Sequence, residues 1–208
     1  FTPTLPHGKT ILHNTVDPAD VNKEYPAAVA IISDAKLFLA DLAEELDRIL
    51  DGPRAEHRAC TVATVARLRA DWLADYEAEF ADDSAPINGY RMFRELWGVL
   101  DPDETILTHE SGASRDIQCV FYQAGGPRSY LGWGQSSQLG FSLGLAMGAK
   151  VAHPDKLVVN VMGDGAVGMT MGDWETASRN DIPILSVIKH DSIFSGYDKH
   201  IPVAIERY

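Results

Sequence analysis

The sequence has no long hydrophobic run, few cysteines and fewer basic than acidic residues. No apolar stretch approaches the roughly 20 residues that a membrane-spanning helix needs, so we expect no spanning segment, and the excess of acidic residues makes an anionic membrane surface a poor partner. Its 18 Lys and Arg residues against 30 Asp and Glu residues give a formal charge of -12, which disfavours nucleic acid as a partner. Cys60 and Cys119 match neither a metal-ligand spacing nor a disulfide framework, so we expect reduced thiols in a cytoplasmic protein.

What remains is the composition of an ordinary globular protein. The chain has 208 residues, of which 45% are hydrophobic, enough for one domain or one and a half. We find no internal repeat and no low-complexity segment. The first residues contain neither a methionine nor a signal-peptide pattern, so we expect the chain to come from the middle of something longer.

The first 89 residues predict two short strands, two helices and a linker. Apolar runs at 9–15 and 27–33 favour strands, and helical spacing of leucines predicts a helix from Ser33 to residue 50. A second long helix is expected over 54–80, with an apolar stripe that belongs to a core or an interface. The acidic, proline-containing segment 81–89 is the best linker candidate.

The rest of the chain alternates strands with helices. Strands are expected at 104–110, 157–162 and 182–189, and helices at 90–100, 140–152 and 170–180, with a glycine-rich passage over 110–140. A fully apolar strand, a helix and a second apolar strand predict a parallel unit buried on both faces. The expected fold class is therefore α/β, with an open, mostly parallel sheet.

The hexapeptide GDGAVG at 163–168 matches the glycine pattern of dinucleotide-binding loops. In that interpretation Asp191 would bind a ribose hydroxyl, but it lies 28 residues after Gly163, where about 20 is usual. In that interpretation the negative charge of Asp164 would also face a pyrophosphate with no positive charge to offset the repulsion. Two unit charges about 4 Å apart cost about 4 kcal/mol at an effective dielectric constant of about 20. An NAD-type oxidoreductase domain is therefore the weaker alternative.

If the site binds a metal ion, the carboxylate of Asp164 has a role as a metal ligand. Asp164 and Asp191 each follow a predicted strand, and neighbouring parallel strands end at the same edge of a sheet. Mg²⁺ is often held by one or two carboxylates together with phosphate oxygens of a ligand. The two aspartates could then bind the ion, and the ion could bind a diphosphate. That both are ordinary turn residues is the remaining possibility.

These residues resemble a known family. The segment 163–191, GDGAVGMTMGDWETASRNDIPILSVIKHD, is similar to the thiamine diphosphate motif of 2-oxo acid-processing enzymes, in the acetolactate synthase-like branch. Residues 87–191 follow the family pattern, and the earlier stretch from Gly8 to Leu42 resembles the end of its central Rossmann-like domain. The resemblance implies three regions: that domain's C-terminal part at 1–50, a helical connection at 51–86, and an incomplete diphosphate-binding domain at 87–208, with helices on both faces of its sheet.

The resemblance also implies a binding site for thiamine diphosphate and Mg²⁺. The metal ligands would be Asp164, Asp191 and the backbone carbonyl of Ile193, while Ser137 and Leu139 would lie beside the aminopyrimidine. The remaining positions match residues that line the diphosphate, namely Gly163, Gly165, Ala166, Ser111, Gly112, Ala113 and Ser114. Here His190 and Asp191 replace a pair of asparagines, Leu139 replaces a frequent methionine, and Ala113 and Ser114 replace bulkier polar residues. We expect a structural role for His190. His109 precedes the Glu110-Ser111-Gly112 loop, from which it could reach substrate, and its role stays open.

The family's chemistry implies groups outside these residues. A glutamate from an N-terminal domain of the partner subunit activates the cofactor, so no catalytic residue is identifiable in this chain. We expect the chain to be inactive alone, and the whole protein to be a homodimer or homotetramer with the active site between subunits. Its substrate would be a small 2-oxo acid, used for decarboxylation, carboligation or both. A cofactor-free regulatory relative is a further alternative.

Overall fold

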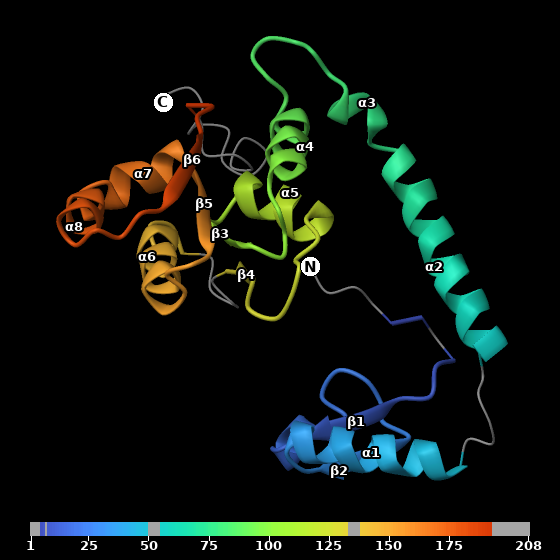
Figure 1. The fold of residues 1–208 in the computed structure, drawn as a ribbon. Coiled ribbons are helices and arrows are strands. Elements are labelled where there is room, and N and C mark those ends of the chain that lie inside the picture. Colours follow the sequence, from blue (N-terminus) through green and yellow to red (C-terminus); the bar gives the residue numbers. More distant parts are fainter. Residues whose placement is uncertain (1–4, 7, 50–54, 133–137, 193–208) are drawn as a thin grey trace. The chain divides into compact units, whose positions relative to one another are not determined.

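The computed structural model describes residues 5–6, 8–49, 55–132 and 138–192, and it divides the chain into two compact units. Unit 1 comprises residues 1–68 and unit 2 residues 69–208. Figure 1 shows both, and each is described by itself. Among the described residues, no helix is long and apolar enough to cross a membrane.

Unit 1 contains a parallel strand pair followed by a helix. Strand β1 (Leu12–Thr15) pairs with β2 (Val29–Ile32) after the 3-10 helix η1 (Pro18–Asp20), and α1 (Ala35–Ile49) follows. The Asp34 carboxylate caps α1, because Oδ1 accepts hydrogen bonds from the N–H groups of Lys36 (2.9 Å) and Leu37 (3.2 Å). Several apolar side chains of this unit are exposed, namely Leu12, Val29, Ile32, Leu37, Leu39, Leu46, Ile49, Val62, Val65 and Leu68.

The predicted helix over 54–80 is interrupted. Helix α2 (Ala55–Ala74) runs through the boundary between the units, and α3 (Glu77–Phe80) is a separate short turn of helix. Trp72 and Tyr76 pack against Phe121 in unit 2, at ring-centroid distances of 4.8 and 4.9 Å. The C-terminal half of the predicted apolar stripe is therefore part of a core.

Unit 2 is built on a four-stranded parallel sheet with strand order β4-β3-β5-β6. The strands are β3 (Thr105–His109), β4 (Tyr130–Leu131), β5 (Leu157–Gly163) and β6 (Leu185–Lys189). The helices are α4 (Gly89–Val99), α5 (Ala113–Phe121), α6 (Ser142–Ala152), α7 (Asp164–Thr170) and α8 (Asp173–Arg179). The predicted parallel pairing of the last two strands is confirmed, and Val161 stands opposite Val187.

Helices cover both faces of this sheet, which confirms the predicted fold class (Figure 1). Alternate strand residues point to opposite faces. Leu107, Val159 and Val161 join one core with Phe93 of α4 and Phe121 of α5. Ile106 and Val158 join a second core with the alanines of α6. β6 differs from the prediction because it is an edge strand of the described sheet, and its Leu185 and Ile188 are exposed.

Two helices differ from the sequence-based expectation. The GDG segment is not a turn before a helix at 170, because α7 begins at Asp164 directly after β5. Ala166 is buried in this helix, so tertiary packing outweighs the low helix propensity of the glycines around it. In the glycine-rich passage, α5 forms because Ile117 and Phe121 lie four residues apart on one buried face.

Candidate cofactor site

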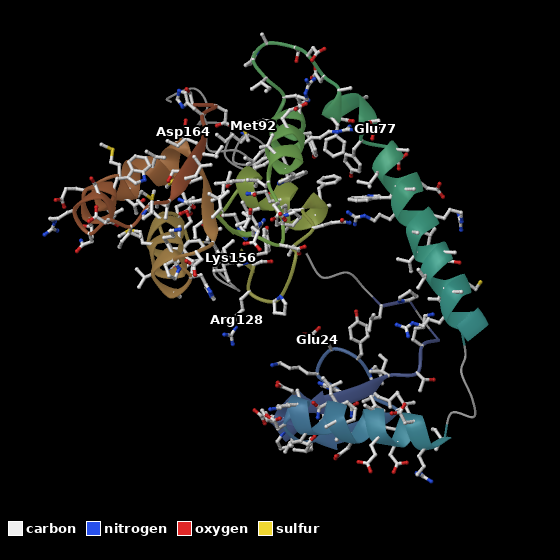
Figure 2. The ribbon with its side chains drawn as sticks, viewed as in Figure 1. Glu24, Glu77, Met92, Arg128, Lys156 and Asp164 are labelled. Atoms are coloured by element: carbon white, nitrogen blue, oxygen red, sulfur yellow. The ribbon has the colours of Figure 1, made fainter. Side chains whose placement is uncertain are left out.

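The predicted site residues that the structure describes gather at the carboxyl edge of the unit 2 sheet. Asp164 begins α7 immediately after β5, whereas Lys156 precedes β5 and lies at the opposite edge (Figure 2). The loop after β3 lies beside β5, because the N–H of Glu110 donates to the carbonyl of Val161 over 3.0 Å. Ligands of open parallel sheets bind at this edge.

The Asp164 carboxylate accepts three hydrogen bonds. Its Oδ1 accepts a hydrogen bond from the N–H of Gly165 (2.8 Å), and its Oδ2 accepts one from the N–H of Ser192 (2.9 Å). His190 Nδ1 also donates to Oδ2, over 2.7 Å. The segment 190–192, which contains Asp191, is thus folded onto the first residue of α7.

The two predicted aspartates have different partners. Asp191 forms an ion pair with Lys189, whereas Asp164 pairs with His190. Within the described ranges, no three His, Cys, Asp or Glu side chains are grouped as a metal site. Ile193 and Ser137 lie outside the described residues. The metal-ligand set therefore stays a prediction, with Asp164 as its described centre.

The donor chemistry of the edge fits a diphosphate bridged by a hard cation. A carboxylate at residue 164 is a suitable ligand for Mg²⁺. A β-carbon added to Gly163 or Gly112 would meet nothing within 4 Å, so a ligand has room to approach the backbone there. Gly112 also has φ of 78°, a conformation that glycine adopts without strain. These observations agree with the implied roles of both glycines.

The Ser111–Ser114 loop starts α5. Gly112 is the N-terminal cap residue and Ala113 the first helical residue. Ser114 is buried, and its hydroxyl donates to the carbonyls of Ser111 (3.1 Å) and Glu110 (3.4 Å). Its hydroxyl is therefore used within the loop, and a diphosphate contact by Ser114 stays a prediction.

A cavity of about 440 Å³ lies beside Leu139, the predicted apolar contact of the aminopyrimidine. It is lined by Gln138, Leu139, Gly140, Phe141 and Met169. Gly140 has φ of 86°, and a β-carbon there would lie 2.9 Å from Cγ2 of Thr170. This glycine lets the segment before α6 pass close to α7, so that Leu139 can line the cavity.

His109 is a buried residue at the end of β3. Its ring stacks on Tyr130 at a centroid distance of 4.9 Å, and its Nδ1–H donates to the carbonyl of Glu110 over 3.0 Å. Burial lowers the pKa of His109 below its usual value of 6.5, and the Glu110 carbonyl partly opposes this effect. The neutral ring therefore carries its proton on Nδ1. Burial also raises the pKa of Tyr130.

Sequence reasoning missed Glu110. Its carboxylate is fully buried and accepts hydrogen bonds from the N–H groups of Gly140 (3.1 Å) and Ser142 (2.8 Å). The signal that could have revealed it is an acid placed between an apolar strand and a Ser-Gly turn. Its partner at the start of α6, more than 30 residues later, is not readable from the sequence.

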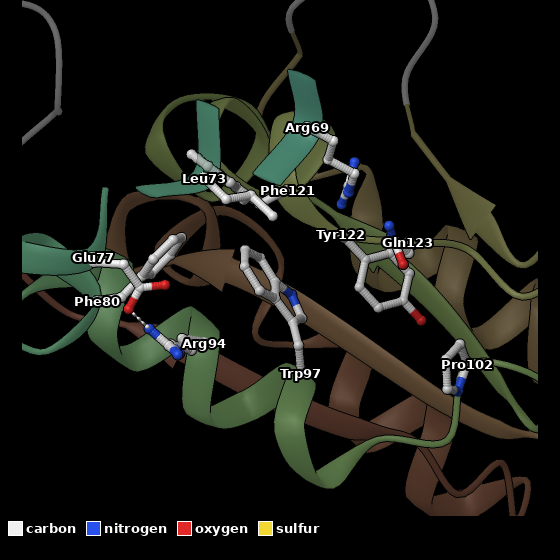
Figure 3. Close-up of a pocket in the computed structure, with 10 residues that line it drawn as sticks. All are labelled: Arg69, Leu73, Glu77, Phe80, Arg94, Trp97, Pro102, Phe121, Tyr122 and Gln123. Atoms are coloured by element: carbon white, nitrogen blue, oxygen red, sulfur yellow. Dashed lines mark hydrogen bonds and ion pairs between the residues drawn. The ribbon is translucent and has the colours of Figure 1, made fainter. Parts of the chain in front are cut away.

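A second cavity in unit 2 contains none of the predicted site residues. It measures about 520 Å³ and lies among the ends of α4 and α5 and the residues from Arg69 to Phe80 (Figure 3). Arg94 pairs with Glu77 over 2.8 Å at one side of it, and its guanidinium lies over the ring of Phe80. Pro102, which precedes β3, also lines it, so this cavity is near the amino edge of the sheet.

Comparison with known proteins gives one family and a consistent set of relatives. Residues 111–198 match the model of the thiamine pyrophosphate enzyme C-terminal TPP binding domain; thiamine pyrophosphate is the same compound as thiamine diphosphate. The chain is 30% identical to a probable acetolactate synthase large subunit of Methanococcus aeolicus over 189 residues, which cover 86% of the chain and 31% of the relative. It is 31% identical over 208 residues to an acetolactate synthase large subunit of Mycobacterium tuberculosis. That match covers 95% of the chain and 34% of the relative. It is 26% identical to the acetolactate synthase isozyme 3 large subunit of Escherichia coli. That match covers 86% of the chain and 30% of the relative. The chain spans about a third of these relatives.

Proposed function

Since the chain belongs to the thiamine diphosphate-dependent enzyme family, among relatives of acetolactate synthase large subunits, we propose that it is the cofactor-binding portion of an enzyme that acts on 2-oxo acids. The observation that carries the proposal is the position of Asp164. It stands at the carboxyl end of β5, and the segment 190–192 folds onto its carboxylate. The dinucleotide-binding alternative is not favoured by the family match.

Asp164 and Asp191 would hold Mg²⁺, together with the backbone carbonyl of Ile193. In this arrangement the cation neutralises the charge of a diphosphate that would otherwise be repelled by two carboxylates. The glycines at 112 and 163 would allow the diphosphate to approach the main chain, and Leu139 would contact the aminopyrimidine. Bound thiamine diphosphate supplies an electron sink for the carbanion left when a 2-oxo acid loses CO₂.

The wider organisation follows the same proposal. Residues 87–208 would form the diphosphate-binding domain, residues 51–86 a connection, and residues 1–50 the end of a central Rossmann-like domain. The parallel pair β1–β2 followed by α1 supports the last assignment. The enzyme would be a lyase or transferase that carries out decarboxylation, carboligation or both. We also propose a cytoplasmic homo-oligomer with Leu139 and Phe141 near a subunit contact, together with Trp133, which lies outside the described residues.

Ligand-dependent thermal stability separates the two cofactor classes. The full-length protein is melted with thiamine diphosphate and Mg²⁺, with NAD, and with neither. A ligand at 100 times its dissociation constant stabilises the folded state by about 2.7 kcal/mol. We expect a rise in Tm only with thiamine diphosphate and Mg²⁺, accompanied by CO₂ release from a 2-oxo acid. A rise with NAD alone would select the dinucleotide-binding alternative.

A further inference from the structure

Glu110 is a fully buried carboxylate that joins segments far apart in the sequence. It follows β3, and its side chain reaches the start of α6, where Oε1 accepts hydrogen bonds from the N–H groups of Gly140 and Ser142. Its Oε2 accepts a longer bond of 3.4 Å from the N–H of Ser111. The side chain is thus placed between the two segments to which the proposed function assigns cofactor contacts.

The main chain of Glu110 is held as firmly as its side chain. Its N–H donates to Val161 of β5, two residues before Gly163. Its carbonyl accepts hydrogen bonds from His109 Nδ1 (3.0 Å) and Ser114 Oγ (3.4 Å). The carboxylate is therefore presented from a fixed point on the sheet edge. Any segment bound to it takes its position from β3 and β5.

The charge of Glu110 suits this position. The first N–H groups of a helix have no partner within the helix, and they carry a partial positive charge. Glu110 supplies an acceptor for the start of α6, an 11-residue helix that has no side-chain cap of its own. On the other side, Gly140 lies against Met169 and Thr170 of α7. The segment 138–141 is thereby fixed between Glu110 and α7.

We propose that Glu110 is a positioning residue, which sets Leu139 and the Ser111–Ser114 loop relative to each other for cofactor binding. This inference rests on the proposed function, because it assigns both segments to the thiamine diphosphate site. Glu110 itself does not touch the reacting atoms. It acts through the backbone amides of Gly140 and Ser142, which fix the side chain of Leu139 at the cavity wall.

The first test measures thiamine diphosphate affinity of the full-length protein by calorimetry at saturating Mg²⁺. Glu110→Ala removes the acceptor for α6, and we expect the dissociation constant to rise at least about tenfold. Thr108→Val is the matched control, because it removes a buried hydrogen bond of 3.0 Å to Asn160 in the same sheet without touching either segment. It should lower Tm but leave the affinity within about twofold. Equal affinities in both variants would overturn the proposal and leave Glu110 as a helix cap.

Glu110→Gln covers the case in which the alanine variant fails to fold. The amide keeps an oxygen for Gly140 and Ser142, but its NH₂ group then faces the N–H of Ser111. We expect a Tm close to that of the wild type and a dissociation constant several-fold higher. An unchanged dissociation constant in the glutamine variant would show that the carboxylate does not position the Ser111 loop.

Hydrogen exchange tests the same inference without the cofactor. In Glu110→Ala, amides at 111–114 and 139–142 should lose protection together, while β5 stays protected. In Glu110→Gln, which keeps an acceptor for Gly140 and Ser142, only the amides at 111–114 should lose protection. Loss at 140–142 alone would overturn the positioning role. If wild-type protein does not bind thiamine diphosphate, the proposed function fails, and the exchange pattern still decides whether Glu110 links the two segments.

Discussion

The imidazole of His190 donates a hydrogen bond to Oδ2 of Asp164 over a distance of 2.7 Å. The carboxylate that we propose as the first metal ligand is therefore already engaged by a residue from the segment after β6. The motif that the sequence resembles has an asparagine at the position of His190. The chain thus differs from its family at a residue that contacts the proposed ligand directly.

Replacement of this histidine tests whether it competes with the cation. In His190→Asn the ring no longer donates to Oδ2, so the oxygen is more available to Mg²⁺. We expect thiamine diphosphate affinity, titrated at fixed Mg²⁺, to stay equal or increase by up to about tenfold, which corresponds to about 1.4 kcal/mol. A loss of more than tenfold would mean that His190 itself helps to hold the cation.

The sequence predicted the sheet edge but not the contacts made there. The apolar runs before Gly163 and His190 predicted neighbouring parallel strands, and this pairing is confirmed, although β6 is an edge strand of the described sheet and not a fully buried one. Asp164 could be selected because a carboxylate in a phosphate-facing loop requires a cation. The acceptor role of Glu110 depends on folding of α6 onto β3, which no local pattern encodes.

Side-chain competition also escaped the sequence analysis. The ion pair of Asp191 with Lys189, two residues before it, was not predicted. Helix α5 was not predicted, because Gly112 and Ser114 are typical of a loop. Ile117 and Phe121, however, are spaced as on one face of a helix. Both depend on which side chains contact each other in the folded protein, and the amino-acid composition does not determine these contacts.

Two substitutions at Asp191 separate its oxygen from its charge. Asp191→Asn keeps an oxygen at the same reach, so thiamine diphosphate affinity at fixed Mg²⁺ should change by about 1 kcal/mol, less than tenfold. Asp191→Ala removes the ligand, and affinity should fall by clearly more than tenfold. Lys189→Gln is the control for loss of the ion pair alone. Slight and equal effects of both Asp191 substitutions would make Asp191 a turn residue.

Two glycines near the start of α6 should respond in opposite directions. Gly140→Ala places a β-carbon 2.9 Å from Thr170 in a residue with φ of 86°, so it should destabilise the protein by more than about 1 kcal/mol. Gly144→Ala meets nothing within 4 Å inside a helix and should stabilise by about 0.5–1 kcal/mol. Thermal unfolding of both variants is the measurement. A stable Gly140→Ala variant would contradict the close approach of this segment to α7.

The stability of the protein should depend on pH through His109. Its pKa is lowered by burial in the folded state, so the unfolded state takes up a proton first as the pH falls below about 6.5. His109 therefore causes stability to decrease as pH falls from its unfolded pKa towards its folded pKa, by at most about 1.4 kcal/mol per pH unit. In His109→Gln, Tm measured between pH 7 and pH 5 should fall less steeply. An unchanged slope would contradict burial of a neutral ring.

The most direct test of the central claim is a calorimetric titration of the full-length protein with thiamine diphosphate, in Mg²⁺ and in excess chelator. Without a cation, the carboxylates of Asp164 and Asp191 repel the diphosphate, so we predict binding in Mg²⁺ and little binding in chelator. Asp164→Ala should abolish the difference between the two conditions. Tight binding in chelator, or Mg²⁺-dependent binding that survives Asp164→Ala, would contradict the proposed cation bridge at the end of β5.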